Sequence, residues 1–111
     1  MLVTIKLSKE IYRIQADFCK ALAHPIRLEI IDLLKSEEKT VSGMMKSLNI
    51  KQAALSQHLA ILRERGVVTS RKKGMNTYYS LRRLEIVDAC SMIRGILREL
   101  MAERNKMVKN I

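Results

Sequence analysis

The chain has 111 residues and a formal net charge of +10, with 48% hydrophobic and only 4% aromatic residues. This apolar content excludes a disordered protein, and one proline and four glycines exclude collagen-like and low-complexity classes. No apolar run approaches the roughly 20 residues of a transmembrane helix, and the N-terminus lacks the features of a signal peptide. With two cysteines, too few for a disulfide framework, we expect one domain over 1–111, in the reducing cytoplasm and without a membrane partner.

The positive charge is concentrated in one third of the chain. Residues 46–83 contain nine basic residues and one acid, Glu64, so this segment carries +8 of the total +10. A solvated basic face is the simplest interpretation, but the pattern within the segment favours a polyanionic partner. The basic residues are Lys46, Lys51, Arg63, Arg65, Arg71, Lys72, Lys73, Arg82 and Arg83.

The first third of the chain predicts two helices. Ser8 is a suitable N-cap for a helix that extends to about Leu22, and Pro25 suits the first turn of a second helix that ends near Ser36. Residues 37–39 are expected to form a loop. The helices have apolar stripes formed by Ile11, Ile14, Phe18 and Leu22, and by Ile26, Ile30, Leu33 and Leu34.

Residues 42–65 predict a helix-turn-helix. Ser42 is expected to cap a short helix through Leu48, and Asn49 tolerates the left-handed conformation with which helices often end. A second helix is expected from about Lys51 to Arg65, stopped by Gly66. The connection of about three residues is typical of a DNA-binding helix-turn-helix.

Residues 67–81 predict a β-hairpin, and the remainder predicts one long helix. Strands are expected at 67–71 and 76–81, joined by a basic tip that includes Lys72 and Lys73. The last helix is expected at 84–107. Its apolar stripe of Ile86, Cys90, Ile93, Leu97 and Leu100 repeats at spacings of four and three, which fits either a pairing face or intramolecular packing.

A helical wheel divides the helix at 51–65 into two sides. Leu55, His58, Leu59 and Leu62 are expected to face the core. The other side carries small residues and two amides, which suit close approach to base edges in a major groove. The predicted DNA-binding residues are Lys51, Gln52, Ala53, Ser56, Gln57 and Arg63 on this helix, and Arg71, Lys72 and Lys73 of the hairpin, which would contact phosphates or a minor groove.

Three segments of the chain together resemble the ArsR/SmtB family of winged-helix repressors. KALAHPIRLEII (20–31) is similar to the family's first block, although the family usually has Asp where this chain has His24. LSQHLAILRERGVV (55–68) resembles its recognition-helix block, and RKKGMNTYYSL (71–81) resembles its wing. The match extends over roughly residues 10–100 in the right order.

The resemblance implies a mainly α-helical winged helix-turn-helix of about five helices with a two-stranded wing. It implies a homodimer formed by the helices at 8–23 and 84–107, which binds a two-fold symmetric operator on double-stranded DNA and represses by occluding the promoter. The family's DNA-contacting positions fall on Gln52, Ala53, Ser56 and Gln57, the residues that the helical wheel also selects.

The ligands of the family's usual metal sites are not found at the matching positions. The segment 42–48 lacks the Cys-x-Cys motif, and the last helix has no histidine, so we expect neither a metal nor another cofactor. Cys19 and Cys90 lie on the two helices that the resemblance places in the dimer interface. They are either a thiol switch that weakens operator binding on oxidation or two small core residues.

Two other functions compete with a sequence-specific repressor. An architectural protein that coats or bends DNA would share the charge, but it would not need an outward face with Gln52, Ser56 and Gln57. An enzyme is not expected, because no nucleophile–base arrangement, phosphate loop or paired-carboxylate motif is found.

Overall fold

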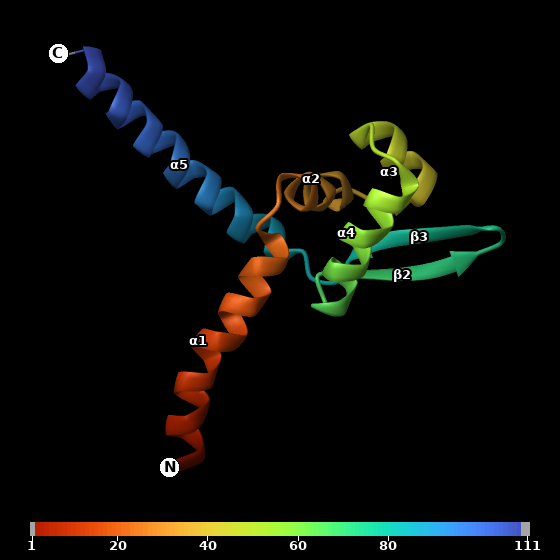
Figure 1. Ribbon diagram of the computed structural model, residues 1–111, viewed down its shortest axis with the longest axis horizontal. Helices are drawn as coiled ribbons and strands as arrows, with labels where there is room; N and C mark the ends of the chain where they lie inside the picture. The colour runs from red at the N-terminus through yellow and green to blue at the C-terminus, as the bar shows by residue number, and fades with distance from the viewer. Residues whose placement is uncertain (1, 110–111) are drawn as a thin grey trace.

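The computed structural model describes the backbone of residues 2–109 and the side chains of residues 8–106. In this part of the chain the order is helix, helix, strand, helix, helix, two strands and a final helix (Figure 1). The elements are α1 (Leu2–Leu22), α2 (Pro25–Leu34), β1 (Lys39–Thr40), α3 (Val41–Leu48), α4 (Gln52–Glu64), β2 (Val68–Lys73), β3 (Asn76–Leu81) and α5 (Glu85–Lys109).

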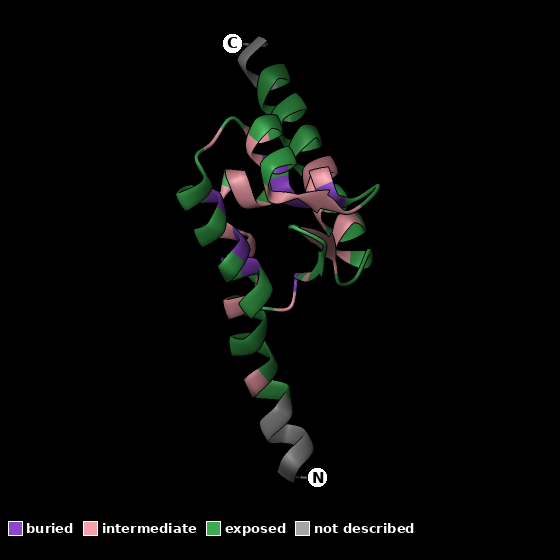
Figure 2. Cartoon of the chain, turned by 90° about the vertical axis from the view of Figure 1, so that its right-hand side faces the viewer, coloured by how far each residue is buried: buried purple, intermediate pink, exposed green. Residues whose placement is uncertain are grey.

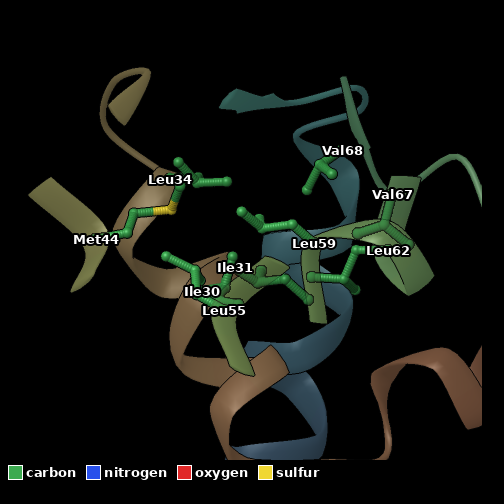
Figure 3. Packing of buried hydrophobic residues seen from close by; sticks show 9 residues of the cluster. All are labelled: Ile30, Ile31, Leu34, Met44, Leu55, Leu59, Leu62, Val67 and Val68. Carbon is green, nitrogen blue, oxygen red and sulfur yellow. The ribbon is translucent and has the colours of Figure 1, made fainter. Parts of the chain in front are cut away.

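One small apolar core joins α2, α3, α4 and the start of β2 (Figure 3). The inner side of α4 contributes Leu55, Leu59 and Leu62, each no more than 1% exposed. Helix α4 therefore has the amphipathic pattern that its sequence predicts, and its position is fixed by this apolar contact. The other members of the cluster are Ile30, Ile31, Leu34, Met44, Val67 and Val68.

The strands form a three-stranded antiparallel sheet in the order β1-β3-β2. Strands β2 and β3 pair continuously, from the Val68–Leu81 pair at the base to the Lys73–Asn76 pair near the tip. This pairing leaves a two-residue turn at the tip. Strand β1 was not predicted from the sequence, which indicated a loop at 37–39; its two residues, Lys39 and Thr40, pair with β3. The hairpin thus has a third strand at its base, and it projects away from the helices (Figure 1).

Helices α1 and α5 extend well beyond the core. They leave the body in different directions (Figure 1), and most of their described length is exposed (Figure 2). The radius of gyration is 17.7 Å, whereas a compact domain of this length has about 13 Å. Large apolar side chains remain exposed on both helices: Ile11, Tyr12 and Ile14 on α1, and Met92, Ile93, Ile96, Leu97, Leu100 and Met101 on α5.

Several predicted boundaries are wrong. Ser8 is not an N-cap, because α1 already begins at Leu2. Thr40 rather than Ser42 caps α3: its Oγ1 accepts a hydrogen bond from the Gly43 N–H at 3.1 Å. Strand β2 continues through Lys73, so Lys72 and Lys73 are strand residues beside the tip. Residues 110–111, at the end of the basic C-terminal segment, lie outside the described part.

The two histidines form a pair between α2 and α4. The Nδ1 of His24 accepts a hydrogen bond from the Ile26 N–H at 3.1 Å, so His24 is the N-cap of α2. Its ring lies 4.4 Å, centroid to centroid, from the ring of His58, which is half-buried on α4. The Nδ1 of His58 is buried and has no hydrogen-bond partner in the described part of the chain. Burial lowers the pKa of His58, and the nearby His24 and Arg27 lower it further.

We predict that acidification destabilises the fold through His58. The unfolded chain takes up a proton near the ordinary histidine pKa of about 6.5, and the folded protein binds that proton more weakly. The free energy of unfolding should therefore decrease as the pH falls from 7.5 to 5.5. Urea unfolding at several pH values measures this decrease, and His58→Gln should make the pH dependence shallower. The prediction is wrong if His58→Gln and the natural chain have the same slope.

Candidate nucleic-acid interface

Helices α3 and α4 are joined by the short turn that the sequence predicts. Asn49, at the end of α3, adopts the left-handed conformation, with φ 53° and ψ 50°, and its N–H donates to the carbonyl oxygen of Met45. Half-buried Ile50 holds the turn against the core. Lys51 is the N-cap of α4 but makes no side-chain capping bond, so its ammonium group stays exposed at the start of the helix.

The side of α4 opposite the core presents neutral polar and small residues to solvent. Gln52, Ala53, Ser56 and Gln57 are all exposed, as the helical wheel predicts. Their chemistry suits base recognition, because an amide pairs with adenine in two hydrogen bonds and a hydroxyl bonds either kind of base edge. Arg63 is exposed near the other end of the same helix.

The hairpin adds basic side chains next to α4. Lys72 and Lys73 are exposed on β2, and neither forms an ion pair with another residue in the range 8–106. An open groove of about 430 Å³ lies between the end of α4 and the hairpin. This groove suits a phosphate backbone, because three cationic groups and three hydroxyls line it. Its lining residues are Arg63, Ser70, Arg71, Lys72, Thr77 and Tyr79.

Arg71 differs from its lysine neighbours because it is engaged within the protein. Its guanidinium donates two hydrogen bonds to the carboxylate of Glu38, with an Nε–Oε2 distance of 2.9 Å. It also lies over the ring of Tyr78, with Cζ 5.4 Å from the centroid. These contacts raise the pKa of Arg71 and lower that of Glu38, chiefly through their shared hydrogen bonds. The ion pair connects the hairpin to the segment between α2 and β1.

A second hollow, of about 280 Å³, adjoins the hairpin tip. It is lined by the start of α3, the start of α4 and the tip. Apart from Gln52, its polar residues were not predicted to contact DNA, although Thr40 and Ser42 could have been found as hydroxyls at a helix N-terminus. The lining residues are Thr40, Val41, Ser42, Met45, Gln52, Met75, Asn76 and Thr77.

The two cysteines line one apolar pocket of about 260 Å³ between α1 and α5. Cys19 is exposed and Cys90 is half-buried. Burial raises the pKa of Cys90, which outweighs the opposite effect of Arg94. Within the described residues, no three His, Cys, Asp or Glu side chains come together in a group that could hold a metal ion. No described helix is long and apolar enough to cross a membrane.

Comparisons with known proteins agree on a class. The family model described as "Bacterial regulatory protein, arsR family" matches residues 24–70. The HTH-type transcriptional regulator Rv0081 of Mycobacterium tuberculosis (strain ATCC 25618 / H37Rv) is 30% identical over 105 residues, which cover 94% of this chain and 92% of that protein. The crystal structure of Rv0081 aligns with a TM-score of 0.78 and 32% identity over 85% of this chain and 95% of that chain.

Two further similarities concern a repressor and a solved domain. The transcriptional repressor SdpR of Bacillus subtilis (strain 168) is 31% identical over 80 residues, which cover 72% of this chain and 89% of that protein. The homodimeric winged helix-turn-helix DNA-binding domain Mb0332 of Mycobacterium bovis has a TM-score of 0.75 at 24% identity, over 85% of this chain and 87% of that chain, which supports the fold.

The fold and the outward face of α4 define a transcriptional regulator with a winged helix-turn-helix DNA-binding domain. The chain belongs to the arsR family of bacterial regulatory proteins, also called ArsR/SmtB.

Proposed function

We propose that this protein is a homodimeric transcriptional repressor that binds a two-fold symmetric operator. The observation that carries this proposal is the exposed neutral face of α4, with Gln52, Ser56 and Gln57, beside basic side chains on the same helix and on the hairpin. A protein that only coats or bends DNA needs the basic groups, but it does not need amides directed at base edges. The similarity to the transcriptional repressor SdpR favours repression, and we propose that the bound dimer represses by occluding a promoter.

We assign different roles to the nine predicted DNA-binding residues. The four on the outward face, Gln52, Ala53, Ser56 and Gln57, lie in the major groove and read bases. The free cationic groups hold phosphates and provide affinity that does not depend on sequence. Arg71 contributes chiefly by holding the hairpin in place, because Glu38 shares its charge. The phosphate-binding residues are Lys51, Arg63, Lys72 and Lys73.

The base-reading and phosphate-binding roles predict different effects of two substitutions. Gln57→Ala should reduce discrimination at particular base pairs, by about 1–3 kcal/mol for a lost bidentate contact. Lys72→Ala should weaken binding to all sequences. It should also reduce the slope of the logarithm of the binding constant against the logarithm of the salt concentration by about one. Fluorescence anisotropy with a duplex selected from a random library, and with unselected duplex, measures both at several salt concentrations.

The outcomes of this experiment separate the two functions. If both variants weaken all DNA equally, Gln57 does not read bases. If the natural chain binds selected and unselected DNA with equal affinity at physiological salt, the protein is architectural and the proposal is wrong.

The exposed apolar faces of α1 and α5 support a dimer. Ile93, Leu97 and Leu100 lie on one side of α5 and each is more than half exposed. Monomeric proteins rarely leave an apolar face of this length in water, because its burial against a partner is favourable. We infer that the partner is a second copy, because two-fold symmetry would place two α4 helices on two operator half-sites.

We predict that a charge on the α5 face disrupts this dimer. Leu97→Asp should yield monomers and weaken operator binding, because an unpaired carboxylate in an apolar interface is strongly unfavourable. Ser91→Asp is the matched control, since Ser91 is exposed on the opposite side of α5. Sedimentation equilibrium measures the mass, and circular dichroism checks the fold. A monomeric natural chain, or an unchanged dimer in Leu97→Asp, would contradict the proposed interface.

We propose further that Cys19 and Cys90 act as a thiol switch. A peroxide would oxidise the exposed Cys19 to a sulfenic acid, and the Cys90 thiol would then attack that sulfur, forming a disulfide and releasing water. The shared pocket supports this pairing. We assign the first reaction to Cys19 because it is exposed, whereas burial raises the pKa of Cys90 and so lowers its reactivity toward peroxide. Ile93 and Leu97 line the same pocket, so a disulfide there would disturb the proposed dimer face.

The switch predicts a change of operator affinity on mild oxidation. Hydrogen peroxide should weaken binding of the natural chain and leave Cys90→Ser unchanged, and dithiothreitol should restore the natural affinity. Mass spectrometry of the non-reduced protein checks for the disulfide. If oxidation has the same effect on both proteins, or none on either, the two cysteines do not form a switch.

A further inference from the structure

Met75 is an apolar side chain in an unusual place. It is 101% exposed at the tip of the β2–β3 hairpin, which makes it the most exposed of the large hydrophobic residues among the described residues. Most of the other exposed large hydrophobic residues lie on α1 and α5, where a second copy of the chain would cover them. Met75 is remote from that face, on the part of the molecule that carries the basic groups. The proposed dimer face therefore does not cover it.

The backbone presents Met75 at a fixed position. The β2–β3 pairing continues to Lys73 and Asn76, so Gly74 and Met75 form the whole turn. Gly74 has φ +65°, a conformation that L side chains rarely adopt. Because glycine takes this position, the turn is tight, and Met75 is held at the apex rather than on a long flexible loop.

The length of the hairpin determines where its tip lies. From buried Val68 to Lys73, six strand residues span roughly 20 Å, so the tip stands well away from the apolar core that holds α4. Met75 and Gln52 both line the 280 Å³ hollow, together with Thr40 and Ser42. The amide and the two hydroxyls in this lining suit a phosphate strand. If that strand occupied the hollow while α4 lay in the major groove, the adjacent groove beside the hairpin tip would be a minor groove.

The chemistry of the side chain limits what it can recognise. A thioether cannot distinguish the hydrogen-bonding patterns of base edges, but apolar side chains insert between base steps in the minor groove and partly unstack them. Such insertion favours pyrimidine–purine steps, because TA and CA steps deform most easily. Lys72 and Lys73 on the same strand would hold the flanking phosphates.

We propose that Met75 is a specificity-determining residue that inserts into the minor groove beside each operator half-site and selects flexible base steps there. This inference rests on the proposed function, since it requires α4 in the neighbouring major groove. Met75 reads the deformability of DNA outside the sequence that α4 contacts.

The test compares flanking steps in one operator. A duplex selected by the natural protein from a random library is remade with TA, CA, AA or GC at the step beside each half-site. The natural chain and Met75→Leu should bind duplexes with TA or CA flanks more tightly than duplexes with AA or GC flanks. In Met75→Ala and Met75→Gln this affinity ratio should fall about tenfold, the scale of one unfavourable base pair. The salt dependence should stay unchanged in all three variants, because no charge is removed.

The contrary outcomes are distinct. Equal affinity of the natural chain for all four flanks, or an unchanged preference in Met75→Ala, would overturn the role of Met75 while leaving the proposed repressor intact. A natural chain that selects no sequence from the library would overturn the proposed function as well. Fluorescence energy transfer between the duplex ends gives an independent readout, since Met75→Ala should bend the selected duplex less than the natural chain.

Discussion

The contact between the inner side of α4 and the body determines the position of every group proposed to bind DNA. Leu55, Leu59 and Leu62 lie at its centre and are almost completely buried. Helix α4 is followed by Gly66, with φ +76°, and then directly by buried Val67 and Val68. The hairpin therefore starts from the same apolar cluster that holds the helix. Because interiors are closely packed, the helix and the wing keep one relative position.

This core also explains why α1 and α5 leave apolar side chains exposed. Its buried members come from α2, α3, α4 and β2, and only Ala21 of α1 is buried among the described residues outside that cluster. A domain this small has only one modest core, so the apolar faces of α1 and α5 find no further partner within the chain. An amphipathic helix whose apolar face is exposed is expected to pack that face against another protein surface. Cys19 and Cys90 line a pocket with Ile93 and Leu97, so they lie beside the proposed interface.

The sequence predicted well what depends on local periodicity and poorly what depends on distant partners. The two sides of α4, the left-handed Asn49 and the hairpin follow from spacing and turn chemistry, and all were found. Strand β1 was missed because two residues have no periodicity, and they become a strand only by pairing with β3. The start of α1 was misplaced because Ser8 has the chemistry of a cap without the position of one. Glu38 and Arg71 are 33 residues apart, so no local pattern connects them.

That last pair changes how the positive charge is interpreted. In the sequence, Arg71, Lys72 and Lys73 are three equivalent charges, and the segment 46–83 has a net charge of +8. In the structure, Glu38 engages Arg71, and Glu85 engages Arg83, so carboxylates from both sides of the segment offset part of its charge. A planar guanidinium suits such a bidentate pair, whereas a lysine ammonium on a flexible stem suits a mobile phosphate contact. The division between arginine and lysine on β2 therefore separates the group that holds the wing from the groups that we propose contact DNA.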